Sequence, residues 1–191
     1  MRWPWIAALL LTLACPDVSA QTWPIDAERA SASFSVRPLW LKRIEGHFPV
    51  VEGVLVRDPE RDTLSVDVRI DARALQMTRG SWLTWAQSEE FFDVERHPWI
   101  RFRSLPFAAH RLREGGTIEG QATLRGVTRP IRFQLAPATC PAPGSACPLH
   151  AEGEVNRSLF GMDAHRVALG DRVRLSFSVM LDPASDQGTL P

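Results

Sequence analysis

Residues that could ligate a metal ion or transfer a proton are scattered along this sequence rather than grouped. The five histidines are His47, His97, His110, His150 and His165, and none of their spacings is the HxH, HxxxH or HExxH of a metal site. The sequence also has no GxSxG motif, which would hold a serine nucleophile on a tight turn. We therefore expect no catalytic residue, no metal site and no cofactor, and we do not expect an enzyme.

The first twenty residues have the pattern of a removable export signal. Arg2 supplies a minimal positive start, an apolar run covers residues 6–14, and the small residues VSA at 18–20 precede the expected cut. The apolar run is far shorter than the ~20 residues that cross a bilayer, so we expect no stable membrane insertion. A lipoprotein acylated at Cys15 is the weaker alternative, because the preceding TLA is a poor match to a lipidation signal.

The charge balance argues against a polyanionic partner. Lys and Arg together number 22, as do Asp and Glu, so the formal net charge is zero. A chain that binds nucleic acid or an anionic membrane surface usually carries an excess of basic residues. We expect neither as a partner.

Two cysteines remain once the export signal is removed. Cys140 and Cys147 flank the segment PAPGSA, whose proline and glycine favour a bend. An even pair in an exported chain predicts a local disulfide, and a pair of free thiols is the alternative.

Most of the remaining chain alternates apolar and polar residues with a period of two, which is typical of strands with one dry face. In the segment FFDVERHPWIRFRS at 91–104, Ile100 and Phe102 alternate with Arg101 and Arg103. The other series lie at residues 32–36, 46–57, 64–70, 118–124, 131–135, 151–155 and 173–181. About eight strands of this kind favour an antiparallel barrel or sandwich. Only residues 81–90 have a helical pattern, with Ser81 as a candidate cap.

The dry face mixes large side chains with small ones, and this leaves two interpretations open. The small residues are Ala32, Gly120, Ala122, Ala151 and Gly153. They leave room for a ligand in an eight-stranded barrel, or they only accommodate large neighbours in a tapered core.

Four segments resemble the YceI-like family in their order along the chain. They are GHFPVVEGVL at 46–55, EEFFDVERHPWIRFRS at 89–104, IEGQATLRGVTRPIRFQL at 118–135 and NRSLFGM at 156–162. The resemblance implies an all-β, eight-stranded antiparallel lipocalin-like barrel over residues 21–182, exported to the bacterial periplasm, with a short helix before Phe91. It also implies an elongated apolar cavity for a polyisoprenoid or an isoprenoid quinone. Residues 1–20 are then the signal peptide and 183–191 a disordered tail.

One segment departs from the family pattern. Before FFD the family commonly has a charged RDxHLRS-like helix, whereas this chain reads WLTWAQS from Trp82 to Ser88. The more apolar helix suits a lid that closes on a lipid tail or a plug that replaces the ligand.

These patterns together predict a periplasmic barrel that binds, stores or transports an isoprenoid-type lipid or quinone. The residues expected to line its cavity are Phe34, Val36, Phe48, Phe102, Ile118, Ala122, Phe133 and Phe177. Those expected at the mouth are Trp40, Trp82, Trp85, Phe91 and Phe92, which ordinary packing at a barrel end would also explain. The alternative function is a protein-interaction module whose barrel is plugged by residues 81–90; a homodimer also stays open.

Overall fold

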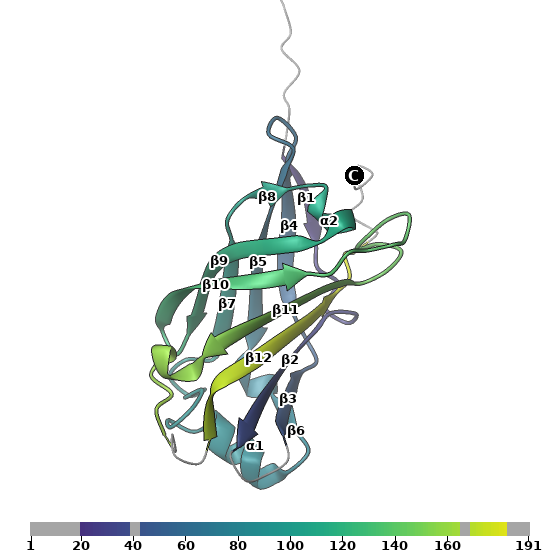
Figure 1. Cartoon of the computed structure of the whole chain (residues 1–191). Helices are drawn as coiled ribbons and strands as arrows, with labels where there is room; N and C mark the ends of the chain where they lie inside the picture. Colours follow the sequence, from purple (N-terminus) through teal and green to yellow (C-terminus); the bar gives the residue numbers. More distant parts are fainter. Residues whose placement is uncertain (1–19, 39–42, 165–168, 183–191) are drawn as a thin grey trace, which may run out of the picture.

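The computed structural model describes residues 20–38, 43–164 and 169–182 (Figure 1). The strands are β1 (Gln21–Pro24), β2 (Ser31–Pro38), β3 (Ile44–Phe48), β4 (Glu52–Asp58), β5 (Thr63–Asp71), β6 (Gln76–Met77), β7 (Trp99–Ser104), β8 (Phe107–Ala108), β9 (Gly116–Leu124), β10 (Val127–Leu135), β11 (Leu149–Asn156) and β12 (Leu169–Val179). Two α-helices, α1 (Gly80–Gln87) and α2 (Arg111–Glu114), and two 3₁₀ helices, η1 (Ala72–Ala74) and η2 (Arg157–Phe160), complete the described elements. Three of the expected features lie outside the described residues: residues 1–19 of the export signal, which include Cys15, the predicted mouth residue Trp40, and the tail 183–191.

All twelve strands belong to one sheet, in the order β1-β4-β5-β7-β9-β10-β11-β12-β2-β3-β6, with β8 beside β5. Every pairing between the strands is antiparallel. The expected all-β antiparallel class is therefore confirmed, although the described part of the chain has more strands than the eight predicted. Four strands are additional. One results from the division of residues 46–57 into β3 and β4. The other three, β1, β6 and β8, have four, two and two residues, too few to show an alternating pattern.

The sheet curls so that the segments that follow the first and last strands of the chain, β1 and β12, meet at one end. Ile25 forms a bridge with Leu181, and the amide of Asp182 donates to the carbonyl of Pro24 at 2.9 Å. We call this the upper end, where β8 and α2 lie in Figure 1, and the opposite end, covered by α1, the lower end. The strand β12, with eleven residues, would span roughly 36 Å of the barrel at 3.3 Å per residue.

Alternation fixes which side chains face inward. In β10, Ile131, Phe133 and Leu135 are buried, while the intervening Arg132 and Gln134 are exposed. Strands β9 and β10 form a hairpin, and its two turn residues, Arg125 and Gly126, have φ angles of 48° and 72°. Two successive positive φ angles match the right-handed twist of the strands that they connect.

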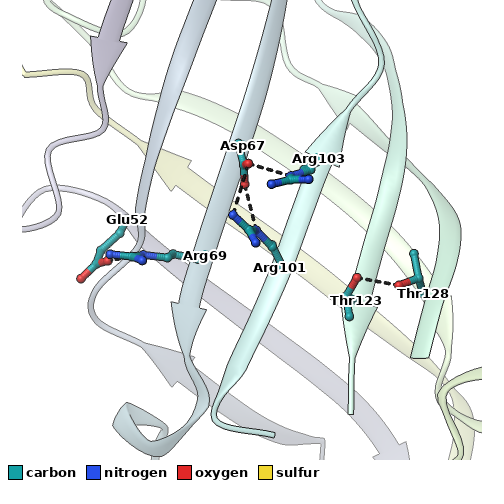
Figure 2. Close-up of polar contacts among 7 residues, drawn as sticks. All are labelled: Glu52, Asp67, Arg69, Arg101, Arg103, Thr123 and Thr128. Atoms are coloured by element: carbon teal, nitrogen blue, oxygen red, sulfur yellow. Dashed lines mark hydrogen bonds and ion pairs between the residues drawn. The ribbon is translucent and has the colours of Figure 1, made fainter. Parts of the chain in front are cut away.

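The outer face is polar, as the alternation predicted. Figure 2 shows Arg101 and Arg103 of β7 on either side of Asp67 of β5, with Nε–O distances of 3.3 and 2.7 Å. On the same face Arg69 pairs with Glu52 at 2.6 Å. Such exposed ion pairs contribute at most about 1 kcal/mol each, so the fold depends mainly on the inner face.

One long predicted strand was wrong. Residues 46–57 divide into β3, which pairs with β2, and β4, which pairs with β5 and β1. Pro49 lies between them and lacks the amide hydrogen that a continuous ladder would need.

The helix before Phe91 is shorter than predicted and begins differently. It covers 80–87 rather than 81–90, and Ser81 is not its cap, because the N-cap position is Arg79, which makes no side-chain capping bond. It ends where Ser88 turns back and donates its hydroxyl to the carbonyl of Trp85 at 2.7 Å.

The predicted disulfide joins Cys140 to Cys147 in the loop between β10 and β11. Within that loop the carbonyl of Gly144 accepts from the amide of Leu181 at 2.8 Å. Arg113 of α2 donates through Nη2 to the carbonyl of Pro141 at 2.8 Å. The loop therefore connects α2 to the chain that follows β12.

Among the described residues, no helix has the length and apolar character needed to cross a bilayer.

Candidate functional site

A cavity of about 100 Å³ lies inside the barrel toward the lower end. Side chains from β2, β3, β5, β7, β9, β10, β11 and β12 surround it, and α1 contributes Trp85 and Ala86. Its lining is apolar except for Ser33, Arg101 and Arg157. The side chain of Arg101 reaches the outer face, where it pairs with Asp67, so it adds no charge to the interior.

A second cavity, of about 90 Å³, lies toward the upper end. Its lining is entirely apolar and includes Leu112 of α2, Phe107 of β8 and Leu181 beyond β12. No described lining residue of either cavity is a His, Cys, Asp or Glu. The interior therefore offers apolar contact and no group suited to acid–base chemistry.

Three aromatic rings separate the two cavities. Phe102 of β7, Phe133 of β10 and Phe177 of β12 line both of them, together with Val68 of β5. The rings of Phe102 and Phe133 have centroids 5.0 Å apart and an interplanar angle of 86°. Those of Phe133 and Phe177 are 5.1 Å apart at 85°. We call these three rings the aromatic wall; edge-to-face packing of this kind is favourable for aromatic pairs.

Glycines on neighbouring strands make room for these rings. A Cβ atom on Gly153 would lie 2.6 Å from the ring of Phe133, and one on Gly120 would lie 2.6 Å from the ring of Phe102. Gly46 has the same relation to Phe34, at 2.3 Å. The glycines of the dry face therefore accommodate large neighbours and do not leave empty space.

The alanines of the dry face behave differently. Ala32 and Ala122 line the lower cavity, and Ala151 lines the upper one. The two interpretations of the small residues thus apply to different positions: the glycines fit the packed core and the alanines fit the cavity.

The structure brings most of the predicted site residues together at the lower cavity. Those that line it are Phe34, Val36, Phe48, Trp85, Phe91, Phe92, Phe102, Ala122, Phe133 and Phe177. Ile118 lines only the upper cavity. Trp82 lines neither cavity and packs beneath the guanidinium of Arg79, whose Cζ is 4.5 Å from the ring centroid.

The aromatic residues predicted at the mouth pack against one another. The rings of Trp85 and Phe91 have centroids 4.1 Å apart. The ring of Phe92 packs against those of Phe34 and Phe48, with centroids 5.6 and 6.0 Å away. In this structure they close the lower end of the barrel, so the alternative interpretation, aromatic packing at a barrel end, describes their present arrangement.

Arg157 is a buried, charged lining residue that was not among the predicted site residues. Its side chain is 1% exposed. The guanidinium donates to the carbonyls of Gly170 at 3.2 Å, Ala164 at 2.8 Å and Leu169 at 3.1 Å, and also to that of Met162. Such charge-assisted bonds compensate for burial, and they attach η2 and the following turn to the start of β12. Arg157 lies in the segment NRSLFGM, which resembles the family. The sequence does not indicate that its hydrogen-bond partners are backbone carbonyls.

Acidic and metal-ligating side chains do not converge in the described part of the chain, where no group of three or more His, Cys, Asp or Glu residues could hold a metal ion. The site is therefore defined by two apolar cavities, the aromatic wall between them and the α1 segment below.

Comparisons with known proteins identify relatives of the whole barrel. The model of the YceI-like domain matches residues 23–181. A UPF0312 protein of Serratia proteamaculans is 24% identical over 182 residues, which cover 91% of this chain and 93% of that protein.

Solved structures agree on the fold. BcnA of Burkholderia cenocepacia superposes with a TM-score of 0.61 at 16% identity, covering 81% of this chain and 98% of that one. A polyisoprenoid-binding domain from Saccharophagus degradans gives a TM-score of 0.63 at 12% identity, with 84% and 97% covered. At these identities the likeness shows the fold, and it confirms the lipocalin-like barrel expected from the sequence.

Proposed function

This chain belongs to the YceI-like family, and from that membership we propose that its interior binds the apolar tail of a polyisoprenoid or a similar long amphiphilic lipid, such as an isoprenoid quinone. The observation that carries the proposal is the apolar interior: two cavities, one above the other, whose described lining contains no acidic residue and no histidine. A structural neighbour described as polyisoprenoid-binding supports the same ligand class. The role is binding, storage or transport rather than catalysis.

Burial of the tail would provide the driving force. Each methylene group removed from water contributes about 0.8 kcal/mol, so a tail needs few polar contacts. An apolar cavity of about 150 Å³ is known to hold a benzene molecule, so the lower cavity of about 100 Å³ accepts a group about the size of one isoprene unit. A longer tail therefore requires α1 and the segment with Phe91 and Phe92 to move outward.

We place the entrance at the lower end for this reason. Helix α1 has no side-chain N-cap, and its Trp85 and Ala86 form part of the cavity floor. Packing of side chains closes this end, and rotation of those side chains would open it. The helix then acts as a lid; a plug, which would leave a protein-interaction module, is the alternative.

We also propose that the mature protein works in the periplasm, because the small residues VSA at 18–20 follow an apolar run of signal-peptide length. N-terminal sequencing of the exported protein should begin at Gln21. An acylated Cys15 at the N-terminus would instead place the protein on a membrane.

The proposed function is tested by what the protein carries. Protein purified from its own host should release an isoprenoid lipid on solvent extraction, detected by mass spectrometry in near-stoichiometric amount. Adding that lipid back to stripped protein should raise the melting temperature, because a ligand selective for the native state stabilises it. Protein that releases no lipid and whose melting temperature does not rise with any isoprenoid would support the plugged barrel.

A further inference from the structure

We propose that the aromatic wall determines how long a tail the barrel accepts, by stopping a tail that enters the lower cavity from reaching the upper one. This inference rests on the proposed function. It goes beyond that function by assigning tail-length specificity to Phe102, Phe133 and Phe177.

The three rings come from alternate strands of the sheet. One strand separates each neighbouring pair in the order β7-β9-β10-β11-β12, and the rings are in edge-to-face contact across those gaps. Val68 of β5 lines both cavities with them and completes the partition. The partition thus reaches from β5 to β12 and divides an interior that would otherwise be continuous.

The glycines hold the rings of the partition in place. The ring of Phe133 occupies the position where a side chain on Gly153 would begin, and that of Phe102 does the same at Gly120. Each ring is therefore packed against a neighbouring strand rather than projecting into open space. A tail that reaches the partition meets close-packed rings, and moving them would disrupt favourable aromatic contacts.

This geometry predicts a limit in the dependence of affinity on tail length. Each further methylene that is buried should raise the affinity about fourfold. The rise continues until the tail fills the lower cavity, of about 100 Å³, and meets the rings. Additional isoprene units then remain outside and leave the affinity nearly constant.

The test measures dissociation constants for a series of isoprenoid alcohols by quenching of tryptophan fluorescence. The series starts at prenol, which has a single isoprene unit, and continues through geraniol, farnesol and geranylgeraniol to longer homologues. In the wild-type protein the affinity should rise and then level off. In Phe133→Ala the partition is breached, so the affinity should go on rising, by at least about tenfold for tails that are already on the wild-type plateau.

Phe107→Ala is the matched control, because Phe107 lines only the upper cavity and lies outside the aromatic wall. It removes the same ring at a place that a tail stopped by the wall does not reach, so the affinities and the plateau should stay as in the wild-type protein. If Phe133→Ala does not fold, Phe133→Leu takes its place. Leucine also removes the ring from the aromatic wall, but it loses less side-chain volume than alanine does.

The outcomes separate this inference from the function on which it rests. Suppose that the short tails bind and that wild type, Phe133→Ala and Phe133→Leu all show the same plateau. This result would overturn the role of the wall and leave lipid binding intact. A wild-type affinity that rises without a plateau would also overturn it. Failure of every alcohol to bind the wild-type protein would refute the proposed function, and the wall's role in specificity with it.

Discussion

The two ends of the barrel enclose cavities of similar size but are closed by different kinds of contact. At the upper end the closure is made by the backbone and by a covalent bond: Ile25 bridges Leu181, whose amide donates to Gly144 inside the Cys140–Cys147 loop. The lower end is covered by α1 (Figure 1). There the rings of Trp85 and Phe91 close the barrel through side-chain packing.

This difference assigns different roles to the ends. Opening the upper end would break ladder hydrogen bonds together with the constraint of the disulfide. Opening the lower end requires rotation of aromatic side chains, whose pairwise contacts are worth about 0.5–1.5 kcal/mol each. It also breaks exposed side-chain hydrogen bonds, from Arg125 to the carbonyl of Glu89 at 2.9 Å and from Gln87 to that of Arg73 at 3.1 Å. Side chains also change rotamer far faster than paired strands separate. The lower end is therefore suited to admit a ligand and the upper end to hold the barrel together.

The largest loss of stability is expected from removing Arg157, whose charged hydrogen bonds connect segments at the lower end. Arg157→Met removes the guanidinium that bonds to the carbonyls of Ala164, Leu169 and Gly170 and leaves buried carbonyls without donors. We expect a loss of about 3 kcal/mol of stability, from a charged hydrogen-bond network of this kind. Thermal unfolding followed by circular dichroism should show a melting temperature lower by roughly 6–12 °C.

Arg172→Met provides the matched control on the same side of the protein. Its side chain is 79% exposed and pairs with Glu154 at 3.5 Å, so its removal should change stability by less than about 1 kcal/mol. Equal melting temperatures for the two variants would show that Arg157 does not hold the lower end together.

A smaller loss of stability is expected from opening the disulfide at the upper end. The double variant Cys140→Ser with Cys147→Ser should lose about 2.5 kcal/mol in the chain-entropy model for so short a loop. Because the bond lies outside both cavities, the dissociation constant for farnesol should stay within about twofold of the wild-type value. A folded double variant that no longer binds farnesol would mean that the upper end takes part in ligand entry, and the contrast between the ends would fail.

The smallest effect concerns an exposed carboxylate near the lower end. The Arg73 side chain, which donates to Asp71 at 2.8–2.9 Å, holds the pKa of that carboxyl below its ordinary value. The stabilisation is present above the ordinary carboxyl pKa and is lost as the pH falls through the lowered value of the folded state. Melting curves should therefore show wild type slightly more stable than Asp71→Asn near neutral pH, and the difference should shrink as the pH falls below the ordinary carboxyl pKa. A difference that persists at low pH would contradict this assignment.

The sequence predicted the parts of the fold that follow from alternation. Strands such as β5, β10 and β12 place apolar residues on one face because side chains alternate across a strand. Ten of the thirteen predicted site residues line the lower cavity, and seven of these ten lie on strands. Trp82 shows where the prediction stops. It lies three residues from Trp85 on the same short helix, yet only Trp85 lines the cavity.

The division of the interior could not be predicted, because it depends on contacts between distant segments. Phe133 rests on Gly153, twenty positions along the chain, and Phe177 joins it from β12. The sequence predicts that Phe133 and Gly153 both lie on the dry face. Only the register between β10 and β11 places them opposite each other. The role of Arg157 could not be predicted for a similar reason, because its partners are backbone carbonyl groups and every residue has one.

The central claim, that the lower cavity receives the apolar tail, is tested most directly by placing a ring in each cavity in turn. Ala122 is 5% exposed and lines the lower cavity, and Ala151 lines the upper one. Calorimetric titration with farnesol should show Ala122→Phe binding at least about tenfold more weakly than wild type, with the ligand-free protein still folded, and Ala151→Phe within about twofold of wild type. Unchanged binding by Ala122→Phe would contradict the claim. Unfolding of Ala122→Phe would also contradict it, because an added ring causes strain of about 1–3 kcal/mol where the core is already filled.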